Sequence, residues 1–288
     1  MPSKSEQTEV ACFGGAHTDL IAQAEAPIVM ASSNPGTVNA RLGGVALNVA
    51  RALSNLNRTT GLVGCVGQDS EGDLIFSTLA NDGIDVSQLQ RSSAYATGRY
   101  VAIEGPDGEL SVAVSDTRAL DHFAPAHLGS ALKAYADARF WFADANLAPA
   151  LLTMIAKQPE RPPLAIDAVS VAKVWHLIDL IDKIDVLFCN LAEAQSITAA
   201  TFASALEAAK GLAETGVKSA VVTNGAAAVG VYDGAKCVEI TVPPARVTSV
   251  TGAGDTLIAG TIDALLAGKQ LPDAAKTGIE VARRKLIQ

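Results

Sequence analysis

The alternation of short apolar runs with helical segments restricts the fold of this chain more than any other sequence feature. Runs rich in Val, Ile, Phe and Cys are followed by stretches in which apolar residues recur at helical spacing. The expected strands are 10–13, 61–66, 139–143, 164–167, 185–189 and 219–223, with a hairpin at 229–232 and 237–242. The expected helices are 45–56, 71–81, 125–135, 149–156, near 171–177, 202–214, a run that begins at Asp255, and 272–286. Strands that helices separate favour a mostly parallel sheet covered on both faces. The sequence therefore predicts an α/β fold.

Two segments interrupt this alternation and predict a second, smaller sheet. Segment 20–42 contains Pro27 and the turn sequence Asn34-Pro35-Gly36, and it has no helical period. In segment 95–115, two strand-like stretches flank the sequence Pro-Asp-Gly, which is typical of a β-hairpin. We expect these two segments to form a small β-sheet lid on a single domain that spans residues 1–288.

The composition excludes several classes of protein. Hydrophobic residues make up 49% of the chain and charged residues 18%, which is typical of a compact globular protein. A net charge of −8 without any basic run argues against nucleic acid as a partner. No stretch approaches the roughly 20 apolar residues of a membrane span, and the polar N-terminus lacks the apolar core of a signal peptide. The cysteines are far apart and show no metal-ligand spacing, so we expect free thiols in a reducing cytoplasm.

A glycine-rich turn, Thr251-Gly252-Ala253-Gly254-Asp255, precedes an apolar run with helical spacing. Such a turn leaves several backbone N–H groups unpaired at a helix N-terminus, where the helix dipole favours an anion. A hydroxyl held beside that anion could lose its proton to Asp255 while it attacks a phosphorus atom. The alternative is that Thr251 caps the helix and Asp255 only complements the dipole.

Other polar residues directly follow expected strands, at 14–19, 167, 190–193 and 223–225. The carboxyl ends of parallel strands meet at one edge of a sheet, and ligands bind at that edge in open α/β sheets. We therefore expect these loops and the glycine turn to form one functional site.

Together these motifs resemble the ribokinase-like (PfkB) family of carbohydrate and nucleoside kinases over nearly the whole chain. Thr251–Asp255 is similar to the C-terminal signature of that family, Gly43–Asn48 to its N-terminal signature, Gly14–Asp19 to its first-strand turn, Asn190–Glu193 to its Asn-x-x-Glu motif and Thr223–Gly225 to its Thr-x-Gly turn. The resemblance implies a three-layer α/β/α fold with a β-sheet lid. It also implies an ATP-dependent kinase that phosphorylates a hydroxyl group.

By this resemblance, Asp255 is the base that deprotonates the acceptor hydroxyl, and Gly252, Ala253 and Gly254 hold the transferring phosphoryl group through their N–H groups. Small residues suit that role because larger side chains would prevent close approach.

The resemblance also implies the nucleotide contacts. Asn190, Thr223, Gly225 and Thr251 are expected beside ATP, and Glu193 is expected to act on Mg²⁺ through water. A solvated helix glutamate is the alternative for Glu193. Asp167 either lies near the phosphates or simply ends a strand.

The acceptor contacts are expected near the N-terminus. Asp19, which only accepts hydrogen bonds when ionised, suits two adjacent ribose hydroxyls, and Gly43 and Gly44 let the sugar lie against the backbone while Asn48 donates to it. A surface turn for Asp19 and a capping role for Asn48 stay open as alternatives. His17 stands where the family commonly has an asparagine that touches the sugar.

Within the family, residues 33–36, 112–116 and 167–170 look like the corresponding segments of pseudouridine kinases. This resemblance makes pseudouridine the first acceptor to consider. Asn34 and Asp116 of the lid segments could then recognise a base edge, although ordinary loop polarity explains them nearly as well. The alternatives are a kinase for ribose, another nucleoside or a ketose, and a sugar- or nucleoside-binding protein without catalysis. A homodimer through the lid is a further possibility.

Two other departures from the family pattern bear on function. Ser249 stands where many relatives have an aspartate associated with a monovalent-cation loop, so we expect weak activation by potassium. The chain also stops at Gln288, whereas relatives usually continue with a segment that helps to enclose the adenine.

Overall fold

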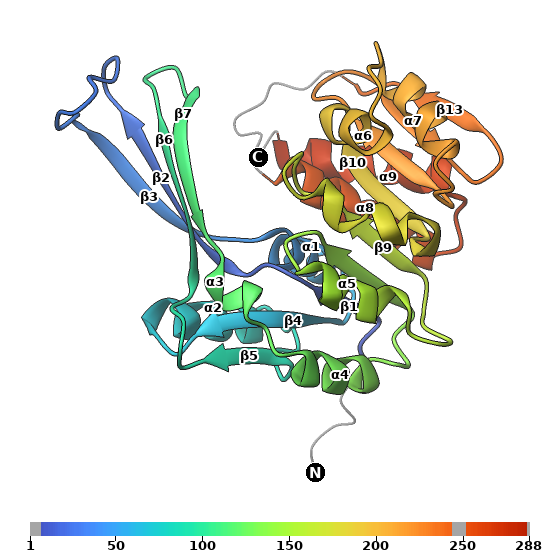
Figure 1. The fold of residues 1–288 in the computed structure, drawn as a ribbon, viewed down its shortest axis with the longest axis horizontal. Helices are drawn as coiled ribbons and strands as arrows, with labels where there is room; N and C mark the ends of the chain where they lie inside the picture. The colour runs from blue at the N-terminus through green and yellow to red at the C-terminus, as the bar shows by residue number, and fades with distance from the viewer. Residues whose placement is uncertain (1–6, 244–251, 287–288) are drawn as a thin grey trace.

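The structure is a computed structural model, and it describes residues 7–243 and 252–286. A nine-stranded sheet forms its centre, in the strand order β13-β12-β11-β10-β9-β8-β1-β4-β5 (Figure 1). The strands are β1 Val10–Phe13, β4 Thr60–Gly67, β5 Leu89–Ser92, β8 Phe140–Asp144, β9 Leu164–Asp167, β10 Val186–Asn190, β11 Ala220–Thr223, β12 Val229–Tyr232 and β13 Cys237–Ile240. All neighbours from β5 to β11 pair in parallel, and only β12 and β13 add antiparallel pairs at one edge. The predicted mostly parallel sheet is confirmed.

Helices cover both faces of this sheet. They are α1 Val45–Ser54, α2 Ser70–Asn81, α3 Arg118–Asp121, α4 Pro125–Ala134, α5 Pro149–Ala156, α6 Leu191–Thr198, α7 Ala205–Ala213, α8 Ala253–Leu266 and α9 Leu271–Leu286, with 3₁₀ turns at Val174–His176 and Ile178–Lys183. Side chains of α1, α2, α8 and α9 form one buried cluster with the sheet, and side chains of α3 to α7 form the other. Strand β8 supplies both clusters, because Phe142 packs into the first and its neighbour Trp141 into the second.

The second sheet has four strands in the order β3-β2-β6-β7 and extends away from the body of the molecule (Figure 1). Its strands are β2 His17–Ala24, β3 Gly36–Gly43, β6 Gly98–Glu104 and β7 Leu110–Asp116. The two hairpins join through the parallel pair β2–β6. This arrangement confirms that the two segments predicted to form a small sheet pair with each other.

Three elements were not expected from the sequence. Strand β5 and helices α3 and α6 are short, and the sequence of each is too short to show a period of its own. The helix expected near 171–177 is only a 3₁₀ turn at Val174–His176, and a second 3₁₀ turn follows at Ile178–Lys183. Cys12, Cys65 and Cys189 are buried free thiols as expected, whereas Cys237 is partly exposed. In the part of the chain that the structure describes, no helix is long and apolar enough to cross a membrane.

Helices α8 and α9 approach each other closely at two glycines. A Cβ atom built on Gly278 of α9 would lie 2.3 Å from Thr261 Oγ1 and 2.4 Å from the Leu257 carbonyl oxygen, both in α8. On the α8 side, a Cβ on Gly260 would lie 2.9 Å from the Gly278 Cα atom. Hydrogen atoms in place of side chains therefore set the distance between the two helices.

This contact generates a stability prediction. We expect Gly278→Ala to lower the free energy of unfolding by about 1–3 kcal/mol, because the new methyl group overlaps backbone atoms that cannot rotate away. The control is Gly129→Ala in α4, where nothing lies within 4 Å of the new methyl group. Alanine favours a helix by about 1 kcal/mol over glycine, so the control variant should be as stable as the parent or more stable. Urea denaturation measures both; a Gly278→Ala variant as stable as Gly129→Ala would contradict the tight contact.

Candidate active site

The site lies where β1, β8, β9, β10 and β11 end, which is the edge at which the polar loops were expected to meet. Helix α8 begins at this edge. Its N-cap, Gly252, has a φ of +73°, a left-handed conformation that glycine adopts without strain. The next residues, Ala253 and Gly254, open the helix, so their N–H groups belong to its first turn. The predicted glycine turn at a helix N-terminus is therefore present, although Thr251 and Ser249 lie outside the described residues.

Asp255 stands in this first turn and is bound to a second helix. Its Oδ2 atom accepts a hydrogen bond of 2.8 Å from the side-chain amide of Asn48, which lies in the first turns of α1. The sequence predicted that Asn48 would contact the acceptor. The structure joins Asn48 to the predicted base, 207 residues away in the sequence, and its contact with the acceptor stays a prediction. The amide can donate only through its nitrogen, so this bond fixes the orientation of the Asp255 carboxylate.

The pKa of Asp255 is raised from its usual value to about 6. Burial is the main cause, because a carboxylate loses hydration as water is excluded. The hydrogen bond from Asn48 and the positive charge of Lys285 oppose this effect, whereas the negative charges of Asp144 and Asp19 add to it. A carboxyl group with this pKa is ionised at neutral pH and still basic enough to accept a proton efficiently.

A fully buried carboxylate, Asp144, holds three parts of the site together. Its Oδ2 atom accepts hydrogen bonds of 2.9 Å from both the Gly15 N–H and the Ala46 N–H, and its Oδ1 atom accepts one of 3.0 Å from the Asn146 N–H. These donors come from the turn after β1, the start of α1 and the turn after β8. A Cβ atom on Gly14 would lie 2.3 Å from Oδ2, so that position also has no room for a side chain.

Asp19 belongs to β2 at the base of the small sheet, and two cationic or polar groups already contact it. His17 Nε2 lies 3.1 Å from Oδ1, and Arg41 Nε lies 3.4 Å from Oδ2. Gly43, at the end of β3, is adjacent, because a Cβ there would lie 2.2 Å from Oδ1. The structure thus brings together His17, Asp19 and Gly43, with Gly44 as the N-cap of α1.

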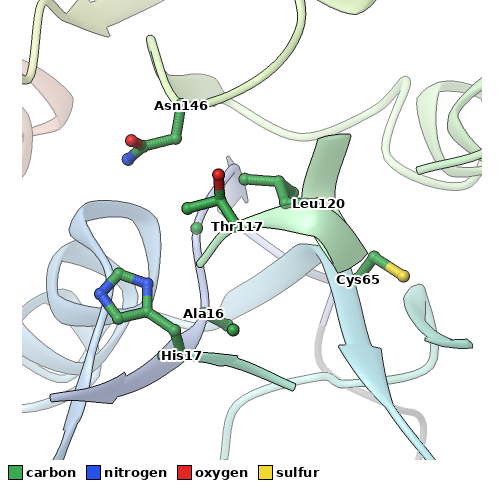
Figure 2. Close-up of a pocket in the computed structure, with 8 residues that line it drawn as sticks. Ala16, His17, Cys65, Thr117, Leu120 and Asn146 are labelled. Atoms are coloured by element: carbon green, nitrogen blue, oxygen red, sulfur yellow. The ribbon is translucent and has the colours of Figure 1, made fainter. Parts of the chain in front are cut away.

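A small recess lies next to this group (Figure 2). It has a volume of about 10 Å³, enough for one water-sized group. Figure 2 shows His17, Thr117 and Asn146 arranged around it. Gly15, Ala16, Cys65, Gly98 and Leu120 complete the lining. Burial raises the pKa of the Cys65 thiol to about 11, so the sulfur is an uncharged part of this wall.

A cavity of about 200 Å³ separates the ends of β9 to β11 from the first turn of α8. Asp167, Glu193, Thr223 and Asp255 all contribute to its lining. The pKa of Asp167 is raised well above its usual value, first by burial and then by the negative charges of Glu193 and Asp255. Asp167 therefore both ends β9 and lines the cavity, and its place near the phosphates stays a prediction.

Glu193 takes part in a capping box at the start of α6. Its two carboxylate oxygens accept 2.8 Å and 2.7 Å hydrogen bonds from the backbone and side-chain nitrogens of Asn190, and Asn190 Oδ1 accepts one from the Glu193 N–H. The glutamate is only 3% exposed, so it is not a solvated helix side chain. Asn190 is tied to this cap.

An apolar cavity of about 360 Å³ continues on the other side of the glycine turn. Thr223 and Gly225 form one wall, and Ala253 and Gly254 lie between this cavity and Asp255. Residues Val229, Val242, Leu257, Ile279, Ala282, Arg283 and Leu286 supply most of the remaining surface. An apolar cavity beside an anion-binding turn suits a ligand with a flat ring system and a charged tail.

The two lid residues predicted to recognise a base are engaged elsewhere. Asn34 closes its own loop, because its side chain accepts from the Val29 N–H and donates to the Val29 and Ser32 carbonyl oxygens. Asp116 forms an ion pair with Arg118, whose hydrogen bonds lower the pKa of Asp116 to about 2. A role in base recognition would use the acceptor capacity that these contacts leave on each side chain.

Asp144, Asn146 and Lys285 were missed as site residues by the reasoning from the sequence. A signal existed for the first two, because both directly follow or end an apolar strand, as the other site loops do. Lys285 gives no such signal. It lies in the last turn of α9, and only the packing of α9 on α8 brings it to the glycine turn, where its Nζ atom contacts the Gly252 carbonyl oxygen at 3.3 Å.

Comparison with known proteins identifies the chemistry associated with this arrangement. The family model described as pfkB family carbohydrate kinase matches residues 7–285. A pseudouridine kinase of Escherichia coli is 26% identical over 259 residues, which cover 88% of this chain and 83% of the relative. An uncharacterised sugar kinase of the same organism is 25% identical over 283 residues, covering 96% of this chain and 78% of the relative. A carbohydrate kinase from Agrobacterium tumefaciens has a structure with a TM-score of 0.82, 30% sequence identity and coverage of 96% of this chain and 90% of its own.

The Asp144 contacts generate a prediction for the site. In Asp144→Asn, an amide nitrogen replaces one accepting oxygen and faces a backbone N–H donor. We expect a loss of about 1–3 kcal/mol of unfolding free energy, the usual penalty for a buried polar group without a partner. Asp107→Asn is the matched control, since Asp107 accepts a hydrogen bond from the Glu109 N–H in an exposed hairpin turn. Equal melting temperatures for the two variants would show that Asp144 does not hold these segments together.

Proposed function

The chain belongs to the pfkB family of carbohydrate kinases and is a phosphotransferase with a hydroxyl acceptor. From this premise we propose that it transfers the γ-phosphoryl group of ATP to a primary hydroxyl of a ribosyl compound. The observation that carries the proposal is the position of Asp255. It lies in the first turn of α8, directly after the glycine turn, and its pKa of about 6 suits a general base.

The proposed reaction is a single in-line displacement. Asp255 takes the proton of the acceptor hydroxyl, and the acceptor oxygen forms a bond to the γ-phosphorus. The bond from that phosphorus to the bridging oxygen breaks, and ADP leaves with the electron pair. The N–H groups of the turn offset charge on the phosphoryl oxygens as the transfer proceeds.

We place the nucleotide in the apolar cavity beyond the turn. Its lining by Gly225, Val229 and Ile279 suits the adenine ring, and Thr223 and Gly254 lie between that cavity and the carboxylate-lined one, where the phosphates would enter. A ribokinase from Arabidopsis thaliana in complex with ribose and ATP has the same fold, with a TM-score of 0.85 at 21% identity.

Magnesium would be held with the phosphates at the carboxylate-lined cavity. Asp167 and Glu193 offer the oxygen atoms that Mg²⁺ prefers. The pKa of Asp167 is raised first by burial and then by the charge of Glu193, and a cation would offset that repulsion. Among the residues that the structure describes, no three His, Cys, Asp or Glu side chains converge as a metal site. The side chains present therefore fit an ion that keeps several waters and is held in part by the phosphates; bound there, it would offset phosphate charge.

We place the acceptor beside Asp19 and His17. The Asp19 carboxylate can accept hydrogen bonds from two neighbouring hydroxyls, and the recess beside His17 can take one further polar group. We propose pseudouridine as the first acceptor, because a pseudouridine kinase is among the relatives that align over most of the chain. Ribose, other nucleosides and ketoses are the competing acceptors.

A screen for ADP release tests the proposed function. Purified protein is incubated with ATP and Mg²⁺ and with pseudouridine, uridine, ribose, adenosine or fructose in turn. Release that depends on pseudouridine, with a phosphorylated product confirmed by mass spectrometry, supports the proposal. If the protein prefers another acceptor, that compound replaces pseudouridine as the proposed substrate. Binding of acceptors without any ADP release indicates a binding protein.

The first prediction from this mechanism concerns Asp255→Asn. The amide keeps the shape of the side chain but cannot accept the proton, so we expect turnover to fall about 10²–10⁴-fold. Acceptor affinity should stay within a few-fold of the parent, as measured by calorimetry. Near-normal turnover of this variant would assign the base to another residue.

The second prediction concerns pH. Asp255 acts only as a carboxylate, and its pKa in the protein is about 6. The rate constant kcat/KM should therefore rise with pH through a midpoint near 6 and level off above it. The nucleotide also titrates in this range, so residual activity of Asp255→Asn serves as the control. A midpoint that persists in that variant would belong to the nucleotide and not to Asp255.

A further inference from the structure

We infer that Lys285 supplies a tethered positive charge at the phosphoryl-binding turn and thereby contributes to phosphoryl transfer. The inference rests on the proposed function, because it assigns a new participant to the same reaction. It concerns a residue at the far end of the chain from the acceptor site, in the last turn of α9.

The packing of α9 against α8 determines where Lys285 lies. The close contact of Gly260 with Gly278 brings the two helices together, and they run in opposite directions. The last turn of α9 therefore lies beside the first turn of α8. Lys285 Nζ donates a hydrogen bond of 3.3 Å to the Gly252 carbonyl oxygen, which confirms this placement.

The turn itself accommodates the ammonium group. A Cβ atom on Gly252 would lie 2.7 Å from Lys285 Nζ and 3.8 Å from Asp255 Oδ2. The ammonium and the carboxylate thus occupy the same side of the turn, close to the N–H groups that would bind the phosphoryl group. Glycine at this position leaves space for the ammonium as well as permitting the left-handed conformation.

The charge balance of the site gives this lysine its significance. Asp19, Asp144, Asp167 and Glu193 lie at or near the same cavities as Asp255, and the whole chain carries a net charge of −8. An anionic nucleotide therefore approaches a region of negative charge and requires local cations.

The other basic groups near the site lie elsewhere in it. Arg41 pairs with Asp19 at the base of the small sheet, and Arg283 lines the apolar cavity on the other side of the glycine turn. Lys285 instead contacts a backbone carbonyl, which leaves its charge unneutralised by that contact. An ammonium group carries three N–H donors, so it can hold the carbonyl and still donate to a phosphoryl oxygen.

Lys285 also acts on the base. Its positive charge favours the carboxylate form of Asp255 and opposes the effects of burial and of Asp144 and Asp19. The Asp167 carboxylate interacts unfavourably with Asp255 from the end of β9. Loss of the lysine charge should therefore raise the pKa of Asp255 and make it a base only at higher pH.

The experiment compares Lys285→Met, Lys285→Arg and the control Lys276→Met. Lys276 lies in the same helix but forms an exposed pair with Asp273, far from the turn. We expect Lys285→Met to lower kcat/KM about tenfold, less than the 10²–10³-fold cost of losing a buried oxyanion donor, because the ammonium is exposed to solvent. The acid limb of its pH profile should move to higher pH. Lys285→Arg should recover most of the activity, and Lys276→Met should match the parent.

Chemical rescue separates a charge effect from a structural one. In Lys285→Ala, propylammonium ions should restore part of the activity at fixed ionic strength, whereas tetramethylammonium, which cannot donate a hydrogen bond, should not. Fixed ionic strength prevents screening from imitating the effect. A loss of activity with neither rescue nor a shifted pH profile would indicate that Lys285 only stabilises the helix, and unchanged activity would also overturn the inference.

A binding measurement distinguishes this inference from the proposed function. Calorimetric titrations measure the binding of two ligands, ADP and the imido analogue of ATP, to the parent and to Lys285→Met. We expect the variant to weaken binding of the analogue about tenfold and of ADP much less, because only the analogue presents a γ-phosphoryl group at the turn. If the parent shows no turnover with any acceptor but this difference appears, the proposed transfer reaction is contradicted, and the inferred position of the lysine charge at the turn is supported. Equal losses for both ligands, or none, would overturn the inference.

Discussion

The buried Asp144 carboxylate is the interaction on which the site depends. It joins the turn after β1, the start of α1 and the turn after β8 through three backbone N–H groups. The position of α1 in turn determines where Asn48 meets Asp255. A carboxylate without exposure to water is costly unless every oxygen is hydrogen-bonded, and here both oxygens accept. A buried group of this kind holds segments in one arrangement, because any displacement would leave a charge without partners.

The second constraint is the close packing of α8 and α9. Because glycines lie at their contact, the helices approach until backbone atoms touch, and this fixes the first turn of α8 relative to the last turn of α9. Two independent contacts consequently hold the start of α8. Asn48 of α1 binds Asp255, and Lys285 of α9 binds the Gly252 carbonyl oxygen. Preorganised donors of this kind need no rearrangement as charge develops during a reaction.

The electrostatics of the site follow from its location at the ends of parallel strands. Several carboxylates meet there, and burial together with mutual repulsion raises the pKa values of Asp255 and Asp167. One consequence is a carboxyl group, Asp255, with a pKa of about 6 beside a cavity lined by further carboxylates. In the proposed reaction, this negative charge is the reason that Lys285, and a metal ion held with the nucleotide, would be needed when an anionic substrate binds.

The sequence by itself determined the class of fold and the position of the glycine turn at the start of a helix. Alternating strands and helices predicted the parallel sheet, the Pro-Asp-Gly hairpin predicted the small sheet, and the glycine turn before Asp255 predicted the anion-binding helix terminus, because each of these signals is local in the chain. Tertiary structure alone decided the partners of those residues. It joined Asn48 to Asp255 across 207 residues and brought Lys285 to Gly252. Such contacts depend on how closely helices pack and which polar groups are buried, and neither property is encoded by a periodic pattern or a short motif.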